Sequence, residues 1–111
     1  MEITVIIKSL NEQENIARAI ESALKAIKGL KGEVVLADSL SIDNTISIAK
    51  KYPIRIVQLI NPRDRSCGIG AQLGYLHSRG KYVYILDGDM KLDKNFLIEG
   101  IKILKLEKDL A

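Results

Sequence analysis

Cysteine, proline and aromatic residues are scarce in this sequence, whose 111 residues include one cysteine, two prolines, one phenylalanine and no tryptophan. Because Cys67 has no second cysteine to pair with, an internal disulfide is excluded, and no charged-then-apolar leader opens the chain. The few aromatic residues do not alternate with basic ones, which argues against a stacking platform for single-stranded nucleic acid. We therefore expect a cytoplasmic protein that does not bind nucleic acid.

Long hydrophobic runs and a strong charge of one sign are missing too. No stretch approaches the roughly 18 apolar residues that a membrane span requires, so membrane association is expected only through a lipid-linked acceptor. The net charge of +3 is spread along the chain and favours an anionic ligand only weakly. The sequence does have 47% hydrophobic residues, which is enough for one core in a single domain over residues 1–111.

Apolar runs of strand length alternate with amphipathic stretches of helix length. Strands are predicted for residues 3–7, 34–37, 54–60 and 82–87. Helices are predicted from a capping box of Asn11 and Glu14 to Gly29, from a cap at Asp43 or Ser41 to Pro53, over residues 68–79, and from Asp93 onward with Leu97, Ile101 and Leu104 facing inward. Because right-handed crossovers between such strands make a parallel sheet with helices on both faces, the predicted fold class is α/β, a three-layer α/β/α sandwich with a mainly parallel sheet.

Polar residues follow each predicted strand, at the edge where an open parallel sheet binds its ligands. They are Ser9, Asn11 and Glu12 after the first strand, Asp38, Ser39, Ser41 and Asp43 after the second, Arg63 and Arg65 after the third, and Asp87, Gly88 and Asp89 after the fourth. The two arginines either pair with phosphate or are simply solvated. His77 has no nucleophile or metal ligand near it in the sequence, and we interpret it as a surface or packing residue.

Asp87 and Asp89, separated by one glycine, are the strongest chemical signal. Two carboxylates at the end of a buried strand can hold Mg²⁺ or Mn²⁺ between the protein and phosphate oxygens. Such an ion would neutralise a diphosphate leaving group as its bond to a sugar breaks. Because Asp and Gly are also common turn residues, a purely structural turn is the alternative interpretation.

Motifs in a fixed order resemble the family 2 glycosyltransferases of the GT-A fold along almost the whole chain. Residues 5–12 match the family's opening strand and its Pro-x-x-Asn-Glu segment, except that Lys8 stands where proline is usual. Residues 38–45 reproduce the pattern D-S-x-S-x-D-x-T after the second strand. Residues 68–74 look like the family's glycine-containing helix start, and residues 84–89 look like its metal-binding DxD motif. The resemblance implies a truncated, Rossmann-like GT-A domain that binds a UDP- or GDP-sugar.

The resemblance also implies roles for individual residues. Asp38 would hydrogen-bond the nucleotide base, Asp87 would lie near the ribose, and Asp89 would bind the metal. The nucleotide-binding residues implied in this way are Ser9, Leu10, Asn11, Glu12, Asp38, Ser39, Ser41, Arg65, Gly70, Asp87 and Gly88, and the implied metal ligands are Asp89 and Asp87. The alternative for Asp38 is a turn or helix cap. We expect Asp43 and Thr45 to shape the turn and cap the helix, with no ligand contact.

Two other motif interpretations fail on position. Residues 68–74 also resemble a dinucleotide fingerprint, but that motif belongs directly after a first strand and not after a third. The run ending in Asp87 is similar to the nucleophile strand of haloacid-dehalogenase-type phosphatases, which need a lysine and further acids downstream. Only 22 residues follow Asp89, so the rest of such a site is missing from this sequence.

The catalytic base is not expected within these residues. By resemblance, inverting family 2 enzymes take an acidic general base from a later, acceptor-binding region, and the sequence stops before it. An alternative to a glycosyltransferase donor domain is a small protein that binds a nucleotide, or associates with a partner, without catalysis. Apolar surface left uncovered by a missing region would favour a homodimer. The base, the sugar and the acceptor stay open.

Overall fold

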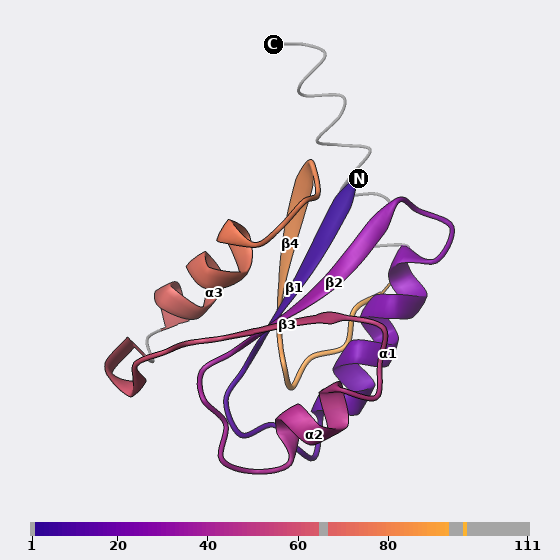
Figure 1. The fold of residues 1–111 in the computed structure, drawn as a ribbon. Helices are drawn as coiled ribbons and strands as arrows, with labels where there is room; N and C mark the ends of the chain where they lie inside the picture. The colour runs from indigo at the N-terminus through magenta and orange to yellow at the C-terminus, as the bar shows by residue number, and fades with distance from the viewer. Residues whose placement is uncertain (1, 65–66, 94–96, 98–111) are drawn as a thin grey trace.

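A single parallel sheet organises the chain. The computed structural model describes residues 2–64, 67–93 and 97. The described residues form the strands β1 (Ile3–Ser9), β2 (Gly32–Asp38), β3 (Arg55–Gln58) and β4 (Tyr82–Asp87), which pair in the order β3-β2-β1-β4. They also form the helices α1 (Ile16–Ile27), α2 (Thr45–Ala49) and α3 (Cys67–Leu76), and a short 3₁₀ turn, η1 (Pro62–Asp64). The predicted α/β class is confirmed (Figure 1).

The strand order reverses between β1 and β4. From β1 the chain steps outward to β2 and then to β3, and it then crosses back to place β4 on the other side of β1. Open parallel sheets bind ligands at such a reversal, outside the carboxyl ends of the strands. The ends of β1 and β4 therefore mark the position where a ligand site is expected.

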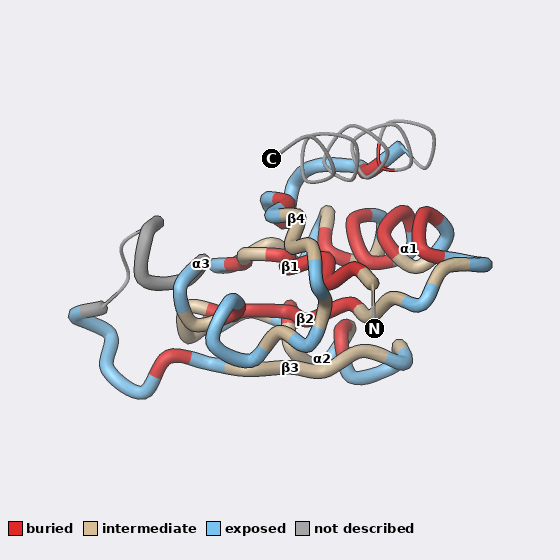
Figure 2. The backbone as a smooth tube through the Cα atoms, turned by 90° about the horizontal axis from the view of Figure 1, so that it is seen from above, coloured by how far each residue is buried: buried red, intermediate tan, exposed pale blue. Residues whose placement is uncertain are grey.

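Helices cover both faces of the sheet, as predicted. The helices α1 and α2 lie on one face and α3 lies on the other (Figures 1 and 2). On the α1 face, Ile3, Val5 and Ile7 of β1 pack in one core cluster with Ile16 and Ile20. These side chains alternate along the strand because successive strand residues point to opposite faces. The red, buried segments of β1 and β2 in Figure 2 lie between the helical layers.

The α3 face is packed closely through a glycine. Gly74 of α3 lies directly over the Ile6 side chain, and a Cβ atom at position 74 would collide with Ile6. A larger residue there would push α3 away from β1, so glycine sets the spacing between helix and sheet. With α3 on one side and α1 and α2 on the other, the three-layer sandwich is confirmed.

The start of the first helix differs from its prediction. Asn11 has a φ of 54°, which is left-handed, and helix α1 begins only at Ile16. The predicted capping box of Asn11 and Glu14 is therefore wrong. The side chain of Asn11 instead accepts a hydrogen bond from the backbone N–H of Ile42, 2.8 Å away in the neighbouring loop. The Asn11 side chain, which the local pattern predicted as part of a helix cap, is therefore used in a contact between two loops.

Three other elements end earlier than predicted, whereas β1 and β2 extend beyond the predicted residues 3–7 and 34–37. Helix α2 ends at Ala49, before Pro53, and α3 ends at Leu76. Strand β3 ends at Gln58 because its partner β2 ends at Asp38, and the N–H of Leu59 donates the final bond to the Asp38 carbonyl at 3.0 Å. Leu97 is buried, in line with its predicted inward position, whereas Ile101 and Leu104 lie outside the described residues.

A polar network joins the amino ends of the strands, opposite the expected ligand edge. The Glu33 carboxylate accepts hydrogen bonds from the Thr4 hydroxyl at 2.8 Å, the Arg79 N–H at 2.7 Å and the Arg55 Nε at 3.0 Å. Partial burial acts to raise the pKa of Glu33, but these bonds and the charge of Arg55 together outweigh it and lower that pKa. The ionised carboxylate thus ties the segment after α3 to β1 and β3.

We predict that Glu33→Gln lowers the free energy of unfolding by about 1 kcal/mol at pH 7, because the charge that strengthens these bonds is lost. Since the folded-state pKa lies below the usual 4.5, this stabilisation is present above that pH and is lost as the pH falls through the folded-state value. Urea unfolding at neutral and acidic pH should show the difference between the two proteins shrinking on acidification. Glu14→Gln, at an exposed position, is the control. Equal stability of the Glu33 variant and the original chain at pH 7 would contradict this prediction.

Candidate functional site

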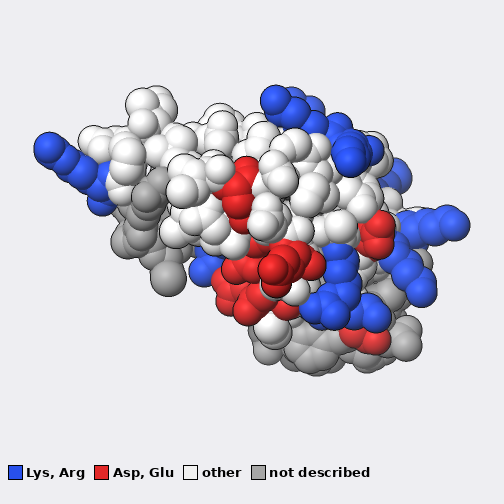
Figure 3. All heavy atoms as spheres, turned by 90° about the horizontal axis from the view of Figure 1, so that it is seen from below, with Lys and Arg blue, Asp and Glu red and all other residues white. Residues whose placement is uncertain are grey.

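The carboxyl ends of the strands bring distant polar residues together. The parallel register places Ser9 beside Asp38, Asp38 beside Gln58, and Lys8 beside Asp87. The loops that follow carry the acidic residues Glu12, Asp43 and Asp89. Figure 3 views the molecule from this side and shows acidic side chains gathered in a patch with basic side chains around it. The predicted convergence of polar residues at the ends of β1, β2 and β4 is confirmed.

Asp38 is the buried centre of this edge. Its side chain has no exposed surface and accepts four hydrogen bonds. One carboxylate oxygen accepts from the hydroxyls of Ser9 at 2.7 Å and Ser41 at 2.5 Å, and the other accepts from the Ser41 N–H at 2.8 Å and the Gln58 amide at 3.1 Å. Buried charge is tolerated only with such compensation. A contact between Asp38 and a nucleotide base stays a prediction. It would require the base to replace one of these four hydrogen-bond donors.

The loop after β1 and the loop after β2 are joined by reciprocal hydrogen bonds. The Asn11 N–H donates to the Ser41 hydroxyl at 2.8 Å, while the Asn11 side chain accepts from Ile42. The Glu12 N–H donates to the Thr45 hydroxyl at 2.8 Å, and the Gln13 N–H donates to Asp43 at 3.1 Å. Because each loop supplies donors and acceptors to the other, the two loops behave as one wall of the site.

Asp43 and Thr45 shape the turn before α2, as predicted, but the predicted cap is wrong, because the N-cap residue is Asn44 and its side chain makes no capping hydrogen bond. The Asp43 carboxylate accepts from the Thr45 N–H at 2.9 Å and also from the Thr45 hydroxyl, which fixes the start of α2. Desolvation acts to raise the pKa of Asp43, but the hydrogen bonds from Thr45 and Gln13 together outweigh it and lower that pKa. Thr45 is fully buried. Both side chains are thus occupied within the fold.

The turn after β4 presents its carboxylates to solvent. Gly88 is buried, and its N–H donates to the Lys8 carbonyl at 2.8 Å. A Cβ atom at position 88 would lie 3.0 Å from that carbonyl oxygen and 3.1 Å from Cγ of Glu12, so only glycine fits without displacing a neighbour. Asp87 and Asp89 on either side are exposed. The turn is therefore anchored at its middle, and the side chains of its two acids are accessible to solvent.

The acids of this turn suit a hard divalent cation that shares its ligands with a bound molecule. In residues 2–64, 67–93 and 97, no group of three or more histidine, cysteine or acidic side chains is placed to hold a metal by itself. Asp87 and Asp89 supply carboxylate oxygens, which Mg²⁺ and Mn²⁺ prefer, and such ions commonly complete their coordination with phosphate oxygens and water. The residues present fit an ion bound together with a diphosphate.

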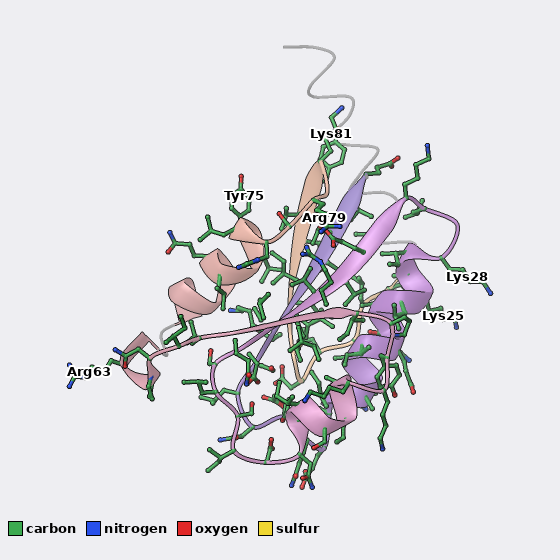
Figure 4. All side chains as sticks on the ribbon, in the orientation of Figure 1. Lys25, Lys28, Arg63, Tyr75, Arg79 and Lys81 are labelled. Atoms are coloured by element: carbon green, nitrogen blue, oxygen red, sulfur yellow. The ribbon has the colours of Figure 1, made fainter. Side chains whose placement is uncertain are left out.

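The remaining predicted site residues divide between the edge and other places. Leu10, which is 41% exposed, and Ser39 lie at the carboxyl edge. The N–H of Ser39 donates a hydrogen bond to the Ser9 carbonyl at 2.8 Å. Gly70 lies within α3, and Arg65 lies outside the described residues. Arg63 points away from the sheet in Figure 4, which favours its interpretation as a solvated residue.

Three further observations concern His77, Gln58 and the length of the helices. His77 is exposed and follows the end of α3, in agreement with its interpretation as a surface residue. Gln58 was missed as a partner of Asp38, because the predicted third strand ran on to residue 60 and the register that pairs Gln58 with Asp38 could not be read from the sequence. None of the helices in the described part of the chain is both long and apolar enough to cross a membrane.

Comparisons with known proteins agree with this geometry. The family model described as Glycosyl transferase family 2 matches residues 4–111. Dolichol-phosphate mannosyltransferase from Pyrococcus furiosus is 26% identical over 117 residues, which cover 100% of this chain and 32% of that protein. This chain therefore spans about a third of the length of that relative.

Two solved structures share the fold. S. aureus TarS 1–349 in complex with UDP-GlcNAc has a TM-score of 0.79 and 22% identity, over 95% of this chain and 31% of that one. Glucosyl-3-phosphoglycerate synthase from Mycobacterium tuberculosis, in complex with Mn²⁺, UDP and phosphoglyceric acid, has a TM-score of 0.73 and 24% identity, over 88% of this chain and 36% of that one. Both likenesses confirm the Rossmann-like sandwich.

We predict that Asp38→Asn lowers the free energy of unfolding by about 2 kcal/mol, because an amide NH₂ would face donors that now bond to a carboxylate. Asp89→Asn is the matched control, since it makes the same chemical change at an exposed position on the same edge and should leave stability unchanged. Urea unfolding followed by circular dichroism measures both. If the two variants are equally stable, Asp38 does not hold the edge together.

Proposed function

Because this chain belongs to glycosyltransferase family 2, as its motifs predicted, we propose that it forms the donor site of a glycosyltransferase and binds a nucleotide-diphospho-sugar through a divalent cation. The observation that carries the proposal is the arrangement at the strand reversal. A hydrogen-bonded frame around Asp38 at the end of β2 shares the carboxyl edge of the sheet with two exposed carboxylates, Asp87 and Asp89, which lie beyond β1. The polar groups of this frame are bonded within the protein, whereas the two acids face solvent. Such an edge is suited to a ligand whose phosphates share a cation with the two acids.

In this proposal Asp89, with Asp87, holds Mg²⁺ or Mn²⁺. When bound there, such an ion would stabilise the diphosphate electrostatically as the bond to the sugar breaks. The joined loops, which include Leu10, Asn11 and Glu12, form one wall of the nucleotide pocket. Ser39, Ser41, Gly70 and Arg65 are proposed to lie around the same nucleotide. The mycobacterial structure with Mn²⁺ and UDP supports the metal, and it supports UDP as the first nucleotide to test.

The sugar acceptor is proposed to be bound outside this chain, which spans about a third of its relative. The general base that deprotonates the acceptor hydroxyl is proposed to come from the same outside region. The relative is named as a dolichol-phosphate mannosyltransferase, so a lipid phosphate is one acceptor class to test. A cytoplasmic location stays a prediction from the sequence, and a homodimer stays open.

We predict that the purified chain binds UDP or a UDP-sugar in the presence of Mn²⁺, and that Asp89→Asn removes the metal-dependent part of this binding. Loss of an outer partner of a metal ligand typically weakens binding by about 10–100-fold, so loss of a ligand itself should weaken it at least as much. Isothermal titration calorimetry with UDP, GDP and their sugar conjugates, with and without Mn²⁺, measures the effect.

Glu14→Gln, which neutralises an exposed carboxylate before α1, is the matched control and should bind like the original chain. Circular dichroism confirms that each variant is folded. If the folded original chain binds none of these nucleotides, the donor-site proposal is wrong, and a domain that only associates with a partner becomes the better interpretation.

A further inference from the structure

Lys8 connects the end of β1 to the acidic turn in two ways. Its backbone carbonyl accepts the N–H of Gly88 at 2.8 Å, which anchors the middle of the turn. Its side-chain Nζ lies 3.2 Å from Oδ1 of Asp87, its register partner on β4. Side chains at paired positions of neighbouring parallel strands point to the same face, so the register itself keeps the ammonium beside this carboxylate. The proline usual at this position of the resembling motif has no charge to place there.

The ion pair changes the charge of the acidic turn. The Lys8 side chain is 24% exposed and that of Asp87 is 63% exposed, so water and salt weaken the attraction without removing it. With Asp87 paired, one positive charge offsets one of the two carboxylates beside Gly88. No ion pair involves Asp89 in the described part of the chain. The turn therefore offers a cation only part of the negative charge that its sequence suggests.

We propose that Lys8 is a positioning residue that holds Asp87 in an ion pair and thereby lowers the affinity of the nucleotide-free site for a divalent cation. The proposal rests on the proposed function, because it assumes that Asp89 and Asp87 form the metal site. The ammonium opposes a cation at Asp87 both by occupying the carboxylate and by like-charge repulsion. A diphosphate adds negative charge to the site and offsets this repulsion. Metal and nucleotide therefore raise each other's affinity, as linkage requires.

The test measures binding of Mn²⁺ alone to the full chain, from the loss of the free Mn²⁺ signal in electron paramagnetic resonance. Lys8→Gln should bind Mn²⁺ more tightly by about fivefold, the order expected for removing one nearby, partly screened charge. Lys81→Gln is the matched control, because Lys81 lies at the opposite end of β4 (Figure 4) and its loss changes the net charge equally. It should shift the affinity by less than about twofold, since charges further apart than a Debye length are largely screened.

A double-mutant cycle separates the ion pair from a general structural effect. In the Asp87→Asn background, Lys8→Gln should tighten Mn²⁺ binding by less than it does in the original chain, because the carboxylate that the ammonium occupies is gone and only the screened repulsion remains. If Lys8→Gln leaves Mn²⁺ affinity unchanged or weaker while Asp89→Asn abolishes binding, the role of Lys8 is wrong and the metal site stands. If Mn²⁺ binds the original chain and Asp89→Asn equally, or binds neither even when UDP is present, the metal site and the role of Lys8 fail together.

Discussion

The buried carboxylate of Asp38 is the constraint on which the ligand edge depends. A charge without exposed surface is tolerated only when hydrogen bonds replace water, and here the donors come from the end of β1, the loop after β2 and the end of β3. Because Ser9, Ser41 and Gln58 must all reach one carboxylate, the three strand ends are fixed relative to one another. The loops that follow inherit this alignment and are joined by further bonds, such as that between Asn11 and Ser41.

The fourth strand is attached to this frame differently. Its turn is held by the backbone bond from Gly88 to Lys8 and by the ion pair between Lys8 and Asp87, with no link to Asp38 among the described hydrogen bonds. The edge therefore combines a part whose polar groups are satisfied internally and a part whose acids face water. Such a division is useful in a binding site, because the first part gives shape and the second part keeps its charge available to a ligand.

The sequence predicted the features that depend on local pattern. Apolar runs such as that from Ile3 to Ile7 marked the strands, and the polar residues after them marked the carboxyl edge of the sheet. Features that depend on the register of distant strands could not be predicted. The left-handed backbone of Asn11 follows from its contact with Ile42, and the pairing of Lys8 with Asp87 joins residues that are adjacent only in the sheet. The hydrogen bond from the Gln58 amide to Asp38 likewise depends on the register of distant strands.

The small number of acids at the edge has a consequence for how a ligand binds. The Glu12 side chain packs against Gly88, and the Asp43 carboxylate accepts a hydrogen bond from the Thr45 N–H. Asp87 and Asp89 therefore remain as the exposed acids of the turn after β4. Two carboxylates do not fill the coordination shell of Mg²⁺ or Mn²⁺, and the remaining positions fall to water or to ligand oxygens. In the proposed site, a cation would be bound most firmly when a diphosphate contributes to its shell. Because the protein supplies so few ligands, a single lysine beside Asp87 can change the affinity of the proposed site for a cation.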